Sequence, residues 1–463
     1  MGAWHRALLA AAVLGASACG GSDDQLPPEL ACYGGGYRLD DGTVIGIVPR
    51  SVDDLRYVLM SGQTGILLPD ENGIWSETDG DVSITMGACG EGSFVFEDAS
   101  GERAGAKIPY VVQETVFDGV DGKRAGRLVL PAGGEADVLM VALHGSERWS
   151  GRTGERFQTM MPAFGIGVFA YDKRGTGASE GAYTQDFYLL ADDAVRARAE
   201  AARLYGETIE IGYVGGSQGG WIGPLAASQD GAAFVVAAYG MAEGPLAEDR
   251  EEVALGLREA GYDEEVIAKA REITDATGLV ISSGFKDGYD ELDAVREKYR
   301  DEPWYDDVEG EFSGQFLPIP NIGLRIVGPW LDVGTSWDYE PRPVIESLEV
   351  PQLWIIADAD RSAPSAPTIA IIQDIQQTKT DIDMVVFPNT DHGIVEFTEG
   401  EDGSRVYGDT AEGYYPLIRD FILTRETRLD VEGPLIYRGK PLEVVEEVDA
   451  EEGGLPGGDG TQP

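Results

Sequence analysis

The feature that most constrains the fold is a series of short, continuously apolar runs that alternate with helical periods. The runs occupy residues 138–143, 166–171, 209–214, 232–238, 352–357 and 384–387. A strand that is apolar on both faces must be covered on both sides, as in a parallel sheet with helices on each face. The sequence therefore predicts an α/β protein with a mostly parallel, doubly wound sheet.

The series of apolar runs is interrupted between residues 241 and 349. Charged amphipathic helices are expected there instead, for example over 246–260 and 264–277. Loops at the carboxyl ends of parallel strands surround the functional site of such folds. We therefore expect a helical cap over the site; the alternative is that these helices only pad the fold.

The two ends of the chain differ from its middle. Short alternating stretches separated by turns predict a small β-rich domain near the N-terminus, without a chemical constellation of its own. The C-terminal end is polar and acidic, which predicts a disordered tail. The expected organisation is a signal peptide at 1–18, a linker at 19–31, the β-rich accessory domain at 32–112, the first part of the core at 113–240, the cap at 241–349, the second part of the core at 350–426 and the acidic tail at 427–463.

The first residues have the pattern of an export signal. Arg6 precedes an apolar run over 7–14, which is too short to span a bilayer, and small residues follow it. Ala16-Ser17-Ala18 suits ordinary signal cleavage, but Cys19 directly after it resembles the lipobox of bacterial lipoproteins and implies lipid attachment at Cys19. Ala16 stands where that pattern usually has Leu, so plain secretion is the alternative. Both interpretations place the protein outside the cytoplasm, as a membrane-anchored lipoprotein or as a secreted or periplasmic protein.

Two further cysteines, Cys32 and Cys89, remain if Cys19 is lipidated. In an oxidising compartment they form a natural pair, and a disulfide between them would staple the N-terminal domain. Three cysteines allow three pairings, so two unpaired buried thiols are the alternative.

The charge of the chain excludes one class of partner. It has 82 acidic and 35 basic residues, a net charge of −47. So large an excess repels nucleic-acid phosphates and anionic lipid surfaces. Nucleic acid is therefore not an expected partner, and the acidic surface is given no mechanistic role.

The strongest motif is Gly215-Gly216-Ser217-Gln218-Gly219, between the apolar run 209–214 and a helix-forming segment. A Ser at a tight turn from strand to helix has a strained backbone, and the flanking glycines leave room for the neighbouring elements. The hydroxyl then projects into the cleft, next to the amino end of a helix. This pattern predicts that Ser217 is a nucleophile; the alternative is an idle Ser in a Gly-rich turn.

Histidines are scarce, which restricts the choice of a general base. The chain holds only His5, His144 and His392, and His5 lies in the expected signal peptide. His144 follows an early strand. In folds that carry a nucleophilic Ser at such a turn, the loop after this strand supplies half of the oxyanion hole from its backbone. His392 follows the last apolar run, where the His of a Ser, acid, His order belongs. His392 is therefore the predicted base.

The acid that orients this base should follow the apolar run 352–357. Asp358 and Asp360 both qualify. The segment from Ala357 to Pro364 resembles a G-x-x-D-x-x-x-P pattern known from a protein family, with Ala357 where Gly is commoner. This resemblance favours Asp360, and Asp358 would then be a turn former.

An oxyanion hole needs two N–H donors, one after the nucleophile and one in the loop after the early strand. Gln218 and Ser146 are the candidates, with Gly145 as the alternative for the second donor. Among the chain's motifs there is no H-E-x-x-H and no Cys/His cluster, so neither a metal nor a cofactor is expected.

Four motifs follow one another in a recognisable order. They are Leu143-His144-Gly145-Ser146, then Tyr171-Asp172-Lys173-Arg174-Gly175-Thr176-Gly177, then Gly216-Ser217-Gln218-Gly219-Gly220-Trp221, and Asp391-His392-Gly393. Over residues 112–425 the chain resembles bacterial α/β-hydrolases near the prolyl-oligopeptidase and proline-iminopeptidase groups. The resemblance implies the α/β-hydrolase fold and suggests that Trp337-Asp338-Tyr339 ends the cap. The loop 172–181 is expected to be structural, although Lys173 and Arg174 could instead contact a substrate.

The expected function is a serine hydrolase that cleaves a carboxylic ester or amide through an acyl-enzyme, with a small-molecule ester, amide or peptide as its partner. A peptidase or aminopeptidase of the same fold is the first alternative. It would need an acidic anchor for the substrate amine, and Glu243, Glu248 and Asp249 of the cap are candidates. A non-catalytic surface-binding protein on the same scaffold is the second.

Overall fold

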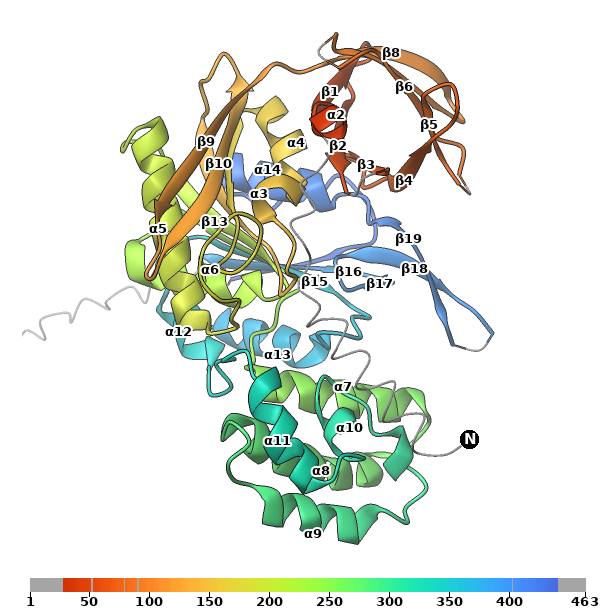
Figure 1. Ribbon diagram of the computed structural model, residues 1–463, viewed down its shortest axis with the longest axis vertical. Coiled ribbons are helices and arrows are strands. Elements are labelled where there is room, and N and C mark those ends of the chain that lie inside the picture. Colours follow the sequence, from red (N-terminus) through yellow and green to blue (C-terminus); the bar gives the residue numbers. More distant parts are fainter. Residues whose placement is uncertain (1–27, 51–52, 79, 90, 402, 440–463) are drawn as a thin grey trace, which may run out of the picture.

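The chain forms a small β-barrel, a large central sheet with helices on both faces, and a helical cap, as the computed structural model in Figure 1 shows. The barrel and the cap lie at opposite ends of the long axis, with the sheet between them. The structure describes residues 28–50, 53–78, 80–89, 91–401 and 403–439. The predicted signal peptide, the lipidation site Cys19 and residues 440–463 of the predicted tail lie outside the described residues.

The central sheet has nine strands in the order β20-β16-β15-β14-β13-β11-β12-β10-β9. From β16 to β12 all neighbours run parallel, whereas β20, β10 and β9 are antiparallel additions at the two edges. The prediction of a mostly parallel sheet is thereby confirmed. The strands are β9 (Tyr110–Asp118), β10 (Lys123–Ala132), β11 (Val138–Leu143), β12 (Ile166–Tyr171), β13 (Ile211–Gly216), β14 (Val235–Ala238), β15 (Gln352–Ala357), β16 (Ile382–Phe387) and β20 (Leu435–Arg438).

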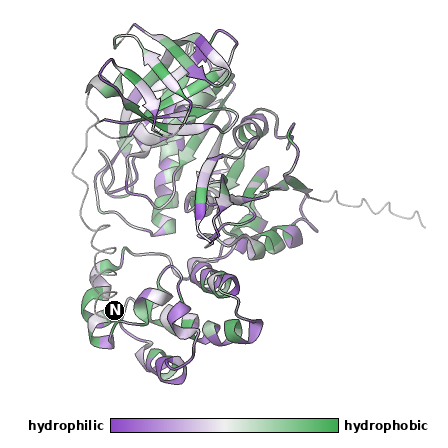
Figure 2. Cartoon of the chain, turned by 90° about the vertical axis from the view of Figure 1, so that its right-hand side faces the viewer, coloured by the Kyte–Doolittle hydropathy of each residue, from purple (hydrophilic) through white to green (hydrophobic). Residues whose placement is uncertain are grey.

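Helices cover both faces of this sheet, which explains why its strands are apolar throughout. Leu139 and Val141 of β11 pack toward α5 (Phe187–Tyr205) and α6 (Gly219–Asp230). Met140, on the same strand, packs on the other face with α14 (Tyr414–Thr424). Successive side chains of a strand point to opposite faces, so each face needs its own apolar cover. Figure 2 shows hydrophobic residues along the central strands and the helices against them.

The N-terminal domain is a closed barrel of eight antiparallel strands. Closure pairs β1 with β8, which leaves no free edge. Its strands are β1 (Gly35–Leu39), β2 (Val44–Pro49), β3 (Leu55–Leu59), β4 (Thr64–Pro69), β5 (Ile74–Glu77), β6 (Ser83–Met86), β7 (Ser93–Asp98) and β8 (Gly101–Lys107). Strand β9 already belongs to the central sheet, so the domain boundary predicted after residue 112 falls inside that strand.

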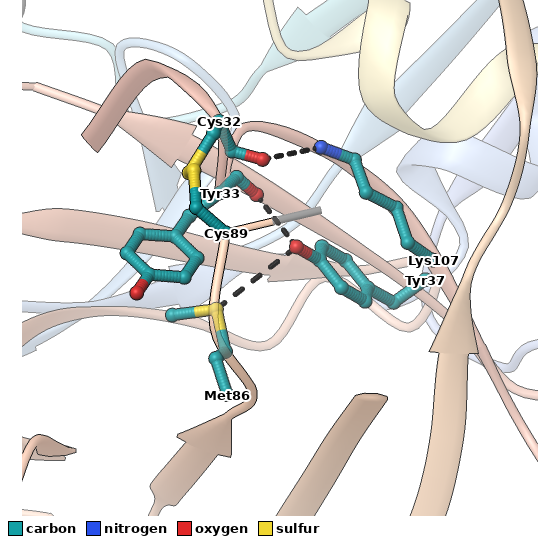
Figure 3. The surroundings of a disulfide bond; sticks show 6 residues. All are labelled: Cys32, Tyr33, Tyr37, Met86, Cys89 and Lys107. Carbon is teal, nitrogen blue, oxygen red and sulfur yellow. Dashed lines mark hydrogen bonds between the residues drawn. A yellow bond between two sulfur atoms is a disulfide. The ribbon is translucent and has the colours of Figure 1, made fainter. Parts of the chain in front are cut away.

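A disulfide joins Cys32 to Cys89, with 5.8 Å between the two Cα atoms (Figure 3). It ties the segment after α2 (Pro28–Ala31) to the loop between β6 and β7. Lys107 Nζ donates to the carbonyl oxygen of Cys32 at 2.6 Å, and Tyr37 donates its hydroxyl proton to the carbonyl of Tyr33. The disulfide thus ties the first described residues to the barrel.

The segment predicted as a cap contains a bundle of helices around a hydrophobic core of its own. The first of them, α7, ends at Glu259, whose carboxylate pairs with Arg361 of the central domain at 3.0 Å. The helices are α7 (Pro245–Glu259), α8 (Glu264–Ser282), α9 (Tyr289–Tyr299), α10 (Ser313–Phe316) and α11 (Asn321–Leu331), followed by α12 (Pro341–Ser347) on the central domain.

Among the described residues, no helix is long and apolar enough to span a bilayer.

The interpretation of residues 427–463 as a disordered tail is wrong in its first part. Residues 435–438 form β20, which pairs antiparallel with β16 from Val386↔Leu435 to Asp383↔Arg438. An unpaired edge of a sheet offers a row of free N–H and C=O groups, and a short β-prone segment satisfies them. The residues on either side of this segment are polar and acidic, so the composition of the whole region predicted disorder.

Candidate active site

Ser217 lies at a sharp turn between β13 and α6. Its φ of 54° is left-handed, a strained value for a residue with a side chain. A Cβ on Gly215 would lie 2.1 Å from the carbonyl oxygen of Gly219, and one on Gly219 would lie 2.3 Å from that of Leu143. Only glycine fits at both positions, because the turn brings strand and helix into backbone contact. Ser217 N–H donates to Ala238 O at 3.0 Å, which anchors the turn to the neighbouring strand.

His392 and Asp360 come together at the carboxyl end of the sheet. Asp360 follows β15, and His392 follows the short strand β17 (Thr390–Asp391) after β16. His392 Nδ1 lies 2.9 Å from Asp360 Oδ2 and 3.2 Å from Oδ1. Asp360 is buried and also accepts the N–H groups of Ser362 and Ala363 at 2.9 and 2.8 Å. The carboxylate is therefore held in place before it meets the imidazole.

Asp358, the competing acid, is exposed and points elsewhere: its carboxylate accepts the N–H of Thr390 at 3.4 Å. The geometry thus selects Asp360. Burial opposes the charged form of His392, but the hydrogen bond and negative charge of Asp360 outweigh burial and raise the pKa of His392 above its usual 6.5.

The two expected oxyanion donors are free to act as such. Among the described residues, neither the backbone N–H of Gln218 nor that of Ser146 has a hydrogen-bond acceptor. Gln218 is the N-cap residue of α6, so its N–H belongs to the unpaired amino end of a helix. An anion in front of this end would meet several N–H dipoles.

The family model of the alpha/beta hydrolase family matches residues 139–403. This range is more than half of the chain and contains Ser217, Asp360 and His392. The chain belongs to the alpha/beta hydrolase family. No curated protein matches the chain.

Several solved structures resemble the chain at low identity. An esterase of Pyrococcus furiosus is 15% identical, with 61% of this chain and 85% of that one covered and a TM-score of 0.38. An acylaminoacyl peptidase of Pyrococcus horikoshii is 16% identical, with 78% and 52% covered and a TM-score of 0.39. A proline iminopeptidase of Mycobacterium smegmatis is 19% identical, with 61% and 92% covered and a TM-score of 0.36. The chain spans about half the length of the acylaminoacyl peptidase.

His144, the other histidine of this α/β-hydrolase core, sits in a different environment. Its ring stacks on Trp149 with 4.6 Å between centroids, and neither ring nitrogen has a hydrogen-bond partner among the described residues. Glu147 Oε2 is 3.8 Å from Nδ1, too far for a hydrogen bond. Burial, helped by the charge of Lys173, lowers the pKa of His144 to about 4. The ring is therefore neutral near pH 7.

Two residues that contact His392 were not assigned a role from the sequence. Asp391 accepts the backbone N–H of His392 at 2.8 Å, together with Arg405 at 2.6 Å and Tyr407 at 2.8 Å. Tyr239 packs edge-on against the imidazole, with ring centroids 5.1 Å apart, and its φ of 39° marks it as strained. Asp391 stands next to a predicted catalytic residue, which was a usable signal; nothing in the sequence singled out Tyr239.

The loop after β12 is buried. Arg174 and Arg124 both bind Asp193, at 2.9 and 3.0 Å, and all three side chains are almost fully buried. Arg174 therefore belongs to an ion network that holds β10, this loop and α5 together, rather than to a surface open to substrate. Lys173 is buried too, but it points toward the site.

The acidic candidates Glu243, Glu248 and Asp249 lie in different surroundings, and the structure places Glu252 next to them. Burial raises the pKa of Glu243, whose Oε2 has no hydrogen-bond partner among the described residues. Asp249 is fully buried and accepts hydrogen bonds from Phe312 N, Ser313 N and Ser313 Oγ, so it serves the cap itself. Burial and the charge of Glu311 raise the pKa of Glu252 to about 8, and the charge of Asp360 adds to this effect. Burial and the charge of Glu252 raise the pKa of Glu248 as well. Glu248 and Glu252 thus lie one turn apart on α7, and the negative charges around them, that of Asp360 included, favour their protonated forms.

In the part of the chain that the structure describes, no group of three or more His, Cys, Asp or Glu side chains has an arrangement suited to a metal ion.

Proposed function

We propose that the chain is an exported serine hydrolase that cleaves a carboxylic ester or amide with Ser217, His392 and Asp360. The observation that carries the proposal is the hydrogen bond from His392 Nδ1 to the buried carboxylate of Asp360, at the carboxyl end of the parallel strands, where Ser217 occupies its strained turn. A carboxylate on Nδ1 keeps that proton in place and leaves Nε2 as a base.

In the proposed reaction, His392 Nε2 takes the hydroxyl proton of Ser217 while the oxygen attacks the substrate carbonyl. The N–H groups of Gln218 and Ser146 stabilise the negative charge that develops on the carbonyl oxygen. Collapse of this intermediate expels the alcohol or amine, which takes the proton from His392. Water, deprotonated by His392, then attacks the acyl-enzyme and releases the acid and Ser217.

Export is part of the proposal. It rests on the signal-like N-terminus, and the disulfide between Cys32 and Cys89 suits an oxidising compartment. Lipid attachment at Cys19 would tether the enzyme to a membrane. Incorporation of labelled palmitate into the wild type and not into Cys19→Ser would support the tether, and equal release of both proteins into the medium would contradict it.

Esters are the first candidate substrates, because an activated serine cleaves them with little demand on protonation of the leaving group. Aminoacyl amides are the second, and one observation favours them. The raised pKa values of Glu248 and Glu252 favour their protonated forms in the free enzyme, and the ammonium group of a bound substrate would favour ionisation and pair with the carboxylate that forms. A panel of p-nitrophenyl esters of graded chain length, compared with aminoacyl p-nitroanilides, distinguishes the two candidates by their kcat/KM.

The decisive variant is Ser217→Ala. We expect loss of its nucleophile to lower kcat on an activated ester on the order of 10⁴-fold or more. A fluorophosphonate should label the wild type at Ser217 and leave the variant unlabelled. A folded Ser217→Ala protein that keeps the wild-type rate contradicts the proposal. A wild type that neither labels nor turns over would support a non-catalytic binding protein instead.

A further inference from the structure

Lys173 carries a buried ammonium group behind the proposed oxyanion hole. It lies in the turn after β12, and only 4% of the residue is exposed. Its Nζ donates to the carbonyl oxygen of Gly145 and, at 3.0 Å, to Oε1 of Gln218. Both acceptors are neutral amide oxygens, so neither hydrogen bond neutralises the charge. Burying an ammonium group in this way lowers the stability of the fold, and such a cost indicates a functional role for the group.

The first acceptor belongs to the peptide unit that supplies an oxyanion donor. The carbonyl of Gly145 and the N–H of Ser146 are the two ends of one peptide group, and in a planar trans peptide they point in opposite directions. A hydrogen bond to the carbonyl end polarises the amide and strengthens its N–H as a donor. Lys173 therefore acts on Ser146 through the peptide bond, from the side away from the donor.

The second acceptor belongs to the residue that supplies the other donor. Gln218 follows the nucleophile, and its side chain is buried with Oε1 held by Lys173. One ammonium group thus ties the loop after β11 to the turn after β13. The distance between the two donors depends on how these two segments sit relative to each other, because no backbone hydrogen bond of the described chain joins Ser146 to Gln218.

We propose that Lys173 is a positioning residue of the oxyanion hole: its ammonium group holds the Gly145–Ser146 peptide and Gln218 together, polarises the donors, and adds a positive charge close to the developing oxyanion. This inference rests on the proposed serine-hydrolase function and deepens it. The stabilisation is larger in the transition state than with bound substrate, since the negative charge appears only on attack.

The charged groups around Lys173 affect the pKa of its ammonium group. Burial lowers the pKa of the ammonium group to about 7, and the carboxylate of Glu147 partly offsets this effect. His144 is neutral near pH 7. Asp172 directs its carboxylate to Ser150 Oγ and to the N–H groups of Arg152 and Ala178, away from Nζ. Above pH 7 the free enzyme therefore loses the positive charge behind the hole.

The test replaces Lys173 by Met, which keeps the length of the side chain and removes the charge and the donors. We expect kcat on an activated neutral ester to fall on the order of 10- to 10²-fold, with KM changed less than about twofold, because only the transition state carries the charge. A trifluoromethyl ketone, which places an oxyanion in the hole, should lose affinity by the same factor. The melting temperature should stay equal or rise, since a buried charge is removed.

Two further variants sharpen the test. Lys379→Met is the matched control, because Lys379 also donates to a backbone carbonyl, that of Leu348, away from the site. It should leave kcat unchanged. Lys173→Arg keeps a charge at every accessible pH, so kcat should recover in part. Wild-type kcat should decline above neutral pH, whereas the decline should be absent in both Lys173 variants.

The possible outcomes separate the two proposals. A folded Lys173→Met protein with wild-type kcat and wild-type inhibitor affinity overturns the positioning role. The positioning role is also overturned if the variant melts at a lower temperature, has a lower kcat and an altered KM, and keeps the wild-type pH profile. That combination indicates a packing defect. If the wild type neither labels at Ser217 nor hydrolyses any ester, the proposed function itself fails, and the inference fails with it.

Discussion

Two loops at the carboxyl end of the central sheet of this α/β-hydrolase each carry a histidine, yet they give it opposite properties: His144 directly follows β11, whereas His392 lies beyond β16 and directly follows the short strand β17. The His144 side chain is 5% exposed, stacked on Trp149 and without a hydrogen bond on either nitrogen. The His392 side chain is 31% exposed and is bound through Nδ1 to Asp360. Burial dominates the first ring and lowers its pKa, whereas the acid dominates the second and raises its pKa. A strand end alone does not make a base; the carboxylate partner and the access to solvent do.

The comparison predicts its largest effect for the loss of the His392 base. In His392→Gln the Ser217 proton has no acceptor, so kcat on an activated ester should fall on the order of 10⁴-fold or more. His144→Gln is the matched control and should change kcat by less than about fivefold, because the ring only packs in its loop. Stopped-flow or steady-state release of p-nitrophenol measures both. Equal losses in the two variants would erase the distinction between the loops.

The second effect concerns the acid. Asp360→Asn keeps the shape of the side chain but favours the wrong tautomer of His392, so kcat should fall about 10³- to 10⁴-fold. Asp358→Asn makes the same chemical change at an exposed residue two positions away and should change kcat less than about threefold. Circular dichroism checks that both variants fold. A large loss in the Asp358 variant alone would transfer the role of the acid to Asp358.

The smallest effect is a difference in titration. His392 must be neutral to act, so kcat/KM should fall as pH drops through a pKa above 6.5. His144, with a folded pKa of about 4 against 6.5 when unfolded, binds fewer protons folded than unfolded between these values. Stability should therefore decline as pH falls from 6.5 to 4, by at most about 3 kcal/mol at 1.36 kcal/mol per pKa unit.

Ring-proton chemical shifts followed by NMR measure both pKa values, and urea titrations at several pH values measure the stability term. His144→Phe should remove part of the acid sensitivity while leaving the kcat/KM profile in place. A His144 ring that titrates near 6.5 would mean that its loop is open to water, contrary to the stacked arrangement.

The parts of the site that sequence reasoning reached are those with a local signature. Ser217 was predicted as the nucleophile because a strand, a Gly-rich turn and a helix follow one another within a short segment, and His392 was predicted as the base because few histidines compete with it. The supporting residues had no such signature. Lys173 acts on Gly145 and Gln218, and Asp391 holds Arg405 and Tyr407; these partners are distant in sequence and meet only when the strands are ordered in the sheet.

The same division holds for the fold. Continuous apolar runs determined by themselves that the sheet is parallel and covered on both faces, since only such a sheet buries both sides of each strand. The short alternating stretches of the N-terminal region indicated strands but not their closure into a barrel, because pairing of β1 with β8 is a contact between the ends of the domain.

The sequence by itself thus determined the class of fold and led to the proposed nucleophile and base, because periodicity and a tight turn are properties of neighbouring residues. Only the tertiary structure showed that Asp360 is in contact with His392, that β20 pairs with β16, and that Lys173 lies behind the proposed oxyanion hole. Each of these depends on distances between segments far apart in the chain. Such distances follow from how the elements pack together, and the sequence of a single strand or helix does not predict them.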